Sequence, residues 1–160
     1  MTTVIYPGTF DPITRGHTHI IERAAVLFSQ VIVAIAADVP KQTLFSPQER
    51  LQLATSSLKH LPQVEVCLFH GLLAGFARQK KIDAILRGTR AIADFEFERQ
   101  MALMNQQLSP GLETLFMTPL ASYAHVSASL VREIAALKGD VSAFVDPRVA
   151  EALAQKFSHP

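Results

Sequence analysis

A threonine and a histidine lie at the two ends of a polar loop near the start of the chain, in the segment Gly8–His17 with the sequence GTFDPITRGH. The apolar run Val4–Tyr6 precedes this loop, and apolar residues recur at helical spacing after it. The pattern predicts a strand, a wide loop and a helix whose first turn carries His17. Unpaired N–H groups at a helix start attract anions, and an imidazole can donate a hydrogen bond to a phosphate. We therefore expect Thr9 and His17 to contact a phosphate group at the carboxyl edge of a sheet.

The spacing of this loop differs from both common phosphate loops. The chain contains neither G-x-x-x-x-G-K-[ST] nor G-x-G-x-x-G, and its seven glycines are scattered. Walker-type NTPases and ordinary dinucleotide oxidoreductases are therefore disfavoured. Taken alone, His17 could also be a capping or surface histidine.

Three further segments place polar side chains at strand ends or helix starts. Lys41 follows the apolar run 31–36, although it could be an ordinary loop lysine. Arg87-Gly88-Thr89-Arg90 follows a short apolar run; its guanidinium groups match phosphate oxygens, although Arg87 could instead pair with Asp94, Glu96 or Glu98. Ser127-Ala128-Ser129 begins a predicted helix and could hold a pyrophosphate or merely cap the helix. Periodicity leaves open whether Arg132 faces this site.

Strands and helices are predicted to alternate along the whole chain. Strands are expected at 4–6, 31–36, 64–69, 84–86 and 114–117. Helices are expected from His17 to about Phe28, 46–58 with a capping box, 72–80, 94–108, 127–137 with Gly139 as its stop, and 147–157. The alternation predicts one α/β domain over residues 1–160, with a Rossmann-like, doubly wound, parallel five-stranded sheet.

The composition limits the class of protein. The chain has 160 residues, of which 49% are hydrophobic and 18% charged, and its net charge of +1 gives no basic field for nucleic acid. The single cysteine, Cys67, is expected as a buried strand thiol. No apolar stretch approaches the ~20 residues that span a bilayer, and no signal-peptide pattern begins the chain. We expect a cytoplasmic protein that binds neither membrane nor nucleic acid.

Three segments together resemble the bacterial phosphopantetheine adenylyltransferase family. They are YPGTFDPITRGH at Tyr6–His17, RGTRAIADFEFERQMALMN at Arg87–Asn105, and S-x-S-L-V-R at Ser127–Arg132. The first is typical of the nucleotidyltransferase superfamily, and the second is more specific to this family. The resemblance implies adenylyl transfer from ATP to 4′-phosphopantetheine, which gives 3′-dephospho-coenzyme A and pyrophosphate in the penultimate step of coenzyme A synthesis.

The resemblance also implies roles for individual residues. The catalytic residues would be His17, Lys41 and Arg90. Phosphopantetheine would be held by Thr9, Lys41, Leu73, Arg87 and Asn105. ATP would be bound by Thr9, Phe10, His17, Gly88, Thr89, Arg90, Glu98, Tyr123, Ala124, His125, Val126, Ser127, Ala128 and Ser129. Ala128 departs from the family, which usually has a third hydroxyl residue there.

The resemblance implies further partners and an assembly. Mg²⁺ would arrive with ATP, without protein metal ligands, and coenzyme A is a candidate feedback ligand. Similar enzymes are homohexamers, and we expect the same here. Two alternatives stay open: a small nucleotidyltransferase with another acceptor, such as a nicotinamide or glycerol phosphate, and a non-catalytic nucleotide-binding module.

Overall fold

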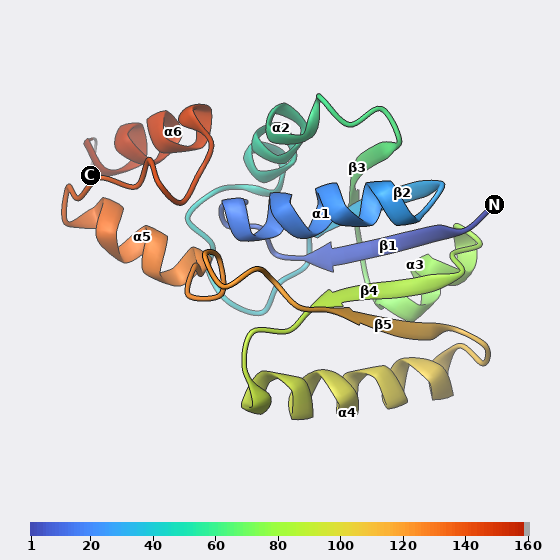
Figure 1. Cartoon of the computed structure of the whole chain (residues 1–160). Coiled ribbons are helices and arrows are strands. Elements are labelled where there is room, and N and C mark those ends of the chain that lie inside the picture. The colour runs from blue at the N-terminus through green and yellow to red at the C-terminus, as the bar shows by residue number, and fades with distance from the viewer. Residues whose placement is uncertain (159–160) are drawn as a thin grey trace.

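Five parallel strands form one sheet in the order β3-β2-β1-β4-β5 in the computed structural model (Figure 1). Each predicted strand is present. The strands are β1 (Thr3–Gly8), β2 (Gln30–Ala36), β3 (Val64–Phe69), β4 (Ala84–Gly88) and β5 (Glu113–Met117). The sheet grows outward from β1 in both directions, which confirms the predicted doubly wound, Rossmann-like α/β fold.

Six helices connect and follow the strands. They are α1 (Arg15–Leu27), α2 (Pro47–Leu58), α3 (Leu73–Gln79), α4 (Ile92–Leu108), α5 (Ala128–Ala136) and α6 (Pro147–Ser158). The structure describes residues 1–158, apart from the side chains of Ile92 and Ala93. The predicted capping box of α2 is present, because the Ser46 and Glu49 side chains each accept a hydrogen bond from the other's backbone N–H.

The central strands are buried on both faces. Val4 and Ile5 of β1 and Val33 and Ala34 of β2 have no exposed surface. Successive residues of one strand belong to different apolar clusters, because they point to opposite faces of the sheet. The strands that carry the loops of interest are therefore fixed by packing on both sides.

Some sequence-based boundaries were wrong. Helix α4 begins at Ile92, two residues before the expected Asp94, and β4 continues through Arg87 and Gly88 instead of ending at Leu86. Cys67 is only partly buried. Lys138 takes the left-handed conformation after α5, with a φ of 62°, so Gly139 is not the conformational stop. Gly139 is needed for space, since a Cβ there would lie 2.6 Å from Ile134 Cγ2.

The switch in strand order lies between β1 and β4, which are direct neighbours in the sheet although α1, β2, α2, β3 and α3 lie between them in the sequence. Their carboxyl ends point toward the start of α5 (Figure 1). Open α/β sheets bind ligands outside the carboxyl ends of strands at such a switch. The loops that follow β1 and β4 therefore have the placement expected of a binding site.

Candidate functional site

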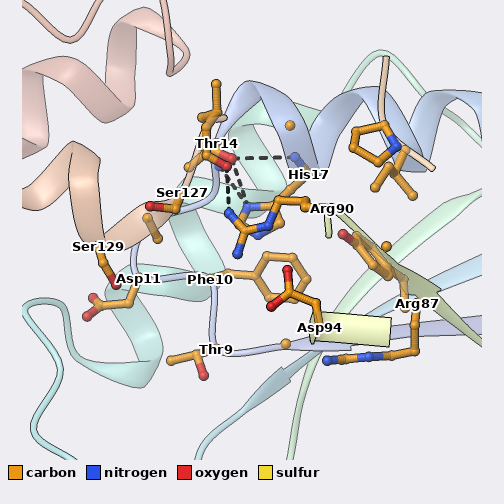
Figure 2. Close-up of a pocket in the computed structure, with 18 of the residues that line it drawn as sticks. Thr9, Phe10, Asp11, Thr14, His17, Arg87, Arg90, Asp94, Ser127 and Ser129 are labelled. Carbon is orange, nitrogen blue, oxygen red and sulfur yellow. Dashed lines mark hydrogen bonds between the residues drawn. The ribbon is translucent and has the colours of Figure 1, made fainter. Parts of the chain in front are cut away.

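A cavity of about 480 Å³ opens at the carboxyl ends of β1 and β4 (Figure 2). This volume is typical of small-molecule sites. Four separate segments form its wall: the loop after β1, the loop after β2, the end of β4 with the start of α4, and the start of α5. The cavity brings together these predicted site residues: Thr9, Phe10, His17, Lys41, Arg87, Gly88, Arg90, Glu98, Tyr123, Val126, Ser127, Ala128 and Ser129.

His17 is held in one orientation by the N-cap of α1. The Thr14 N–H donates to His17 Nδ1 at 3.0 Å, while the Thr14 hydroxyl accepts from the His17 N–H at 3.4 Å. A ring nitrogen that accepts a backbone N–H carries no proton, so the neutral imidazole carries its proton on Nε2. The capping box thus makes Nε2 the donor.

His17 is neutral at physiological pH. Burial, together with the positive charges of Arg90 and Arg87, lowers its pKa to about 4. A neutral Nε2–H can still donate to an anion while no proton is lost or gained.

The aromatic rings of Phe10 and Tyr6 pack beside the His17 imidazole. The Phe10 ring meets the His17 ring edge-on with 4.9 Å between centroids, and Tyr6 meets Phe10 at 5.7 Å. Phe10 is 3% exposed and has a φ of 51°. Its side chain therefore belongs to the core and also forms part of the cavity wall. Burial raises the pKa of the Tyr6 hydroxyl to about 12.

Arg87 forms the ion pair that the sequence left as an alternative. Its Nε and Nη2 each donate to one carboxylate oxygen of Glu98 at 2.7 Å, and Nη1 donates to the Pro7 carbonyl at 2.9 Å. The pair raises the pKa of Arg87 against the opposing effect of burial. These three bonds leave two of the five guanidinium N–H groups for a ligand. Glu98 serves here as an anchor for Arg87.

The start of α5 faces the same cavity. Ser127 is the N-cap, and its hydroxyl accepts from the Leu130 N–H at 3.1 Å. Arg90 Nη1 donates to the Val126 carbonyl at 2.9 Å, which brings a guanidinium group to this helix start. Free N–H groups and a nearby arginine favour an anion. Figure 2 shows Arg90 between His17 and Ser127.

A second, smaller cavity of about 120 Å³ adjoins the first along α4. Leu73, Asn105 and Thr114 line it, and Arg87 and Glu98 line both cavities. The Thr114 hydroxyl is buried and has no hydrogen-bond partner among residues 1–158. The two predicted phosphopantetheine residues that are absent from the large cavity, Leu73 and Asn105, thus lie together in the adjoining one.

Comparison with known proteins identifies the family. The profile of the cytidylyltransferase-like family matches residues 5–134, which include every residue that lines the large cavity and all five strands apart from Thr3 and Val4 of β1. The chain belongs to the cytidylyltransferase-like family. This membership places it among the nucleotidyltransferases and assigns the cavity to a nucleotide-binding Rossmann-like domain.

One solved structure shows how far the fold extends. A protein of Vibrio parahaemolyticus assigned as a nicotinate-nucleotide adenylyltransferase superposes with a TM-score of 0.75 at 17% sequence identity. The match covers 100% of this chain and 98% of that one. At this identity the similarity concerns the fold, and it includes α5 and α6.

Three predicted residues lie outside the cavity lining. Thr89 donates its N–H to the Met117 carbonyl, and the His125 ring packs against Phe144. Ala124 lies in the turn between Leu120 and Val126. Gly88 lines the cavity, but its missing Cβ would lie 2.5 Å from Ile20 Cδ1. A larger residue there would require the Ile20 side chain of α1 to move.

Sequence reasoning left the direction of Arg132 open and missed two buried charges, Asp11 in the cavity wall and Arg50 behind it. Arg132 Nη1 donates to the Asp11 carbonyl, and the side chain lines the cavity. Asp11 is 5% exposed, and its carboxylate oxygens accept from the Leu44 and Phe45 N–H groups at 2.9 Å each. Arg50 is 1% exposed and reaches the loops after β1 and β2. No local sequence pattern indicated the roles of Asp11 and Arg50, because their burial and their contacts arise only in the folded chain.

Within residues 1–158, no group of three or more His, Cys, Asp or Glu side chains could hold a metal ion. In the same residues, no helix is both long and apolar enough to cross a membrane.

Proposed function

We propose that this protein transfers the adenylyl group of ATP to 4′-phosphopantetheine and releases 3′-dephospho-coenzyme A and pyrophosphate. The observation that carries the proposal is the pair of adjoining cavities that share Arg87. The large cavity offers groups from four segments that can donate hydrogen bonds to phosphate oxygens. The small one offers apolar walls with an amide and a hydroxyl, which suit an extended arm that carries amides and ends in a phosphate.

The residues of the large cavity suit a direct in-line displacement. An oxygen of the acceptor phosphate forms a bond to the α-phosphorus, and the bond between that phosphorus and the bridging oxygen breaks with its electron pair leaving on pyrophosphate. Such a reaction needs positioning and charge stabilisation, and it needs no nucleophilic side chain.

Each group then has a defined task. His17 Nε2–H and the Lys41 ammonium would donate to the charge that develops at the α-phosphate. The free N–H groups of Arg87 would orient the acceptor phosphate. Arg90 and the N-terminus of α5 would hold the leaving pyrophosphate. Thr9, the first residue of the loop after β1, would contact the phosphates between these groups.

Mg²⁺ would bind to the triphosphate itself. The described residues include no group of three or more acidic, histidine or cysteine side chains that could hold the ion, and Mg²⁺ is commonly bound through substrate phosphates. Coenzyme A, which contains the proposed product, is a candidate feedback ligand for the same two cavities.

The proposed assembly is a homohexamer, as the resemblance implies. One apolar face of α4 supports self-association: Phe97, Met101, Met104 and Leu108 are all exposed at helical spacing in the isolated chain.

An acceptor screen tests the proposed reaction. Purified protein is incubated with ATP, Mg²⁺ and one acceptor at a time: 4′-phosphopantetheine, nicotinate mononucleotide or glycerol 3-phosphate. We expect pyrophosphate release only with 4′-phosphopantetheine. Release with nicotinate mononucleotide would instead match the activity assigned to the Vibrio protein, and no release with any acceptor would favour a non-catalytic binding module.

A further inference from the structure

Arg50 is a buried arginine whose hydrogen bonds all go to backbone carbonyl oxygens. It lies in the first turn of α2 and is 1% exposed. Its Nη1 donates to the Thr9 carbonyl at 2.7 Å and to the Ala36 carbonyl at 2.9 Å, and its Nε donates to the Phe45 carbonyl at 3.3 Å. Burial of an arginine is costly, so this arrangement needs an explanation.

The three carbonyls lie at the ends of two segments that form the cavity wall, the loop after β1 and the loop after β2. Thr9 begins the loop after β1, and Ala36 ends β2. Phe45 ends the loop that carries Lys41 and leads into α2. Arg50 therefore holds both ends of the Lys41 loop, and it ties them to the residue that begins the loop with His17.

A second buried charge, the carboxylate of Asp11, binds the end of the Lys41 loop. The Asp11 carboxylate accepts the Leu44 N–H at 2.9 Å and the Phe45 N–H at 2.9 Å. Phe45 thus gives its N–H to a buried carboxylate and its carbonyl to a buried guanidinium. Asp11 belongs to the β1 loop, so both contacts fix the Lys41 loop relative to Thr9. We call Asp11 and Arg50, with the backbone groups that they bind, the loop clamp.

We propose that Arg50 is a positioning residue for the transfer reaction, which sets the place of Lys41 relative to Thr9 and His17 through the loop clamp. Arg50 does not line the cavity and so does not touch the substrates. The role of Lys41 rests on the proposed function, whereas the clamp itself is a property of the fold. A misplacement of about 1 Å in a catalytic group can lower the rate by about 100-fold.

Lysine is a poor substitute for Arg50 in this geometry. A guanidinium presents several N–H groups in a fixed fork and can reach three carbonyls, whereas an ammonium is a compact charge on a flexible stem. Arg50→Lys should therefore keep the buried positive charge but loosen the loop. Leu58→Ala is the matched control, because Leu58 is 2% exposed on the same helix, belongs to the apolar core and does not line the cavity.

The first experiment needs no activity. The folded parent, Arg50→Lys and Leu58→Ala are digested briefly with trypsin, and cleavage of the Lys41–Gln42 bond is followed by mass spectrometry. We expect cleavage at this bond to be faster by about tenfold or more in Arg50→Lys than in the parent, because local opening of the loop becomes easier. Equal acceleration in Leu58→Ala would overturn the clamp, since global destabilisation would then explain the result.

The second experiment separates positioning from stability. Turnover of ATP and 4′-phosphopantetheine is measured for Arg50→Lys, for Lys41→Ala and for the double variant. We expect Arg50→Lys to lower kcat by about tenfold to 100-fold, with KM for ATP changed less than about threefold. In the Lys41→Ala background, Arg50→Lys should lower kcat by less than about threefold, because Arg50 acts through Lys41. An equal loss in both backgrounds would overturn the proposal.

Asp11→Asn provides a second test if Arg50→Lys does not fold. This substitution weakens the other half of the loop clamp, so cleavage at the Lys41–Gln42 bond should again be faster than in the parent. Its effect on kcat should again be smaller in the Lys41→Ala background. Equal effects on kcat in both backgrounds would overturn the proposal. If the parent turns over no acceptor, the proposed function fails, while the proteolysis experiment still decides whether the clamp exists.

Discussion

His17 is bound to the backbone of its own helix start, and this bond decides which ring nitrogen faces the cavity. With Nδ1 accepting from Thr14, Nε2–H is the group available to a phosphate. The low pKa, about 4, keeps the ring neutral throughout the range in which most enzymes work. A neutral donor of fixed orientation costs no reorganisation when charge develops at the α-phosphate.

Removal of this donor should affect the chemical step far more than binding. We expect His17→Ala to lower kcat by about 100-fold to 1,000-fold, the usual effect of losing one such donor, and to change the ATP dissociation constant only slightly. His60→Ala is the control, since His60 lies at the surface beside Glu22. An unchanged kcat in folded His17→Ala would contradict the role.

The pKa of His17 also makes stability depend on pH. Between about 6.5 and 4, the unfolded chain binds a proton at His17 that the folded chain does not. The folded state therefore loses stability from His17 as pH falls through this window, and the loss is absent above it. Urea unfolding of the parent and of His17→Asn measures this.

The parent should lose more stability than His17→Asn between pH 7 and pH 4. Carboxylates titrate in the same window, but they do so in both proteins, so the difference between the two isolates His17. A difference that stays constant with pH would show that His17 titrates normally.

At the scale of elements, the apolar periodicity of the sequence was sufficient for the sheet and helices. Continuous apolar runs predicted the central strands, and Ser46-Pro47 with Glu49 predicted the start of α2 because capping is local chemistry. The error at Gly139 has a physical reason: the sequence shows a glycine, but only the packed Ile134 shows that its use is steric.

Without the family resemblance, the site could be predicted only where its residues lie at the end of a strand or begin a helix. Thr9, His17, Arg87 and Ser127 met that condition. The contacts of Arg50 to Thr9 and of Asp11 to Phe45 span 41 and 34 residues, and no local pattern encodes such contacts. The partner of Arg87 was one of three candidate carboxylates until the turn of α4 placed Glu98 opposite it.

The ion pair between Arg87 and Glu98 links β4 to α4. Its contribution to stability can be measured separately from the contribution of Arg87 to acceptor binding. Arg87→Gln alone should lower stability, because it leaves the Glu98 carboxylate, which is 12% exposed, without its partner. It should also raise KM for 4′-phosphopantetheine. In the double variant Arg87→Gln/Glu98→Gln, stability should recover much of this loss, whereas KM should stay high.

Calorimetric titration of each substrate and thermal unfolding of both variants check this prediction. ATP affinity should change little in Arg87→Gln. If ATP binding is lost and acceptor binding survives, Arg87 belongs to the nucleotide subsite instead.

At the scale of the whole molecule, the apolar face of α4 is exposed in the single chain, and we expect other copies of the chain to bury it. We expect sedimentation analysis to show a particle of six 17.6 kDa chains. Met104→Glu places a charge on this face away from both cavities, and should shift the protein toward smaller species. Gln107→Glu, on an exposed position of the same helix outside the apolar face, is the control. A monomeric parent would contradict the hexamer.

The central claim is that the two cavities that share Arg87 bind ATP and 4′-phosphopantetheine for adenylyl transfer. One assay tests this claim most directly. Pyrophosphate release is measured with ATP, Mg²⁺ and 4′-phosphopantetheine, and the nucleotide product is identified by mass. We predict that pyrophosphate and 3′-dephospho-coenzyme A form in equal amounts, and that omission of the acceptor abolishes both. Pyrophosphate release with a nucleotide acceptor and none with 4′-phosphopantetheine would contradict the account.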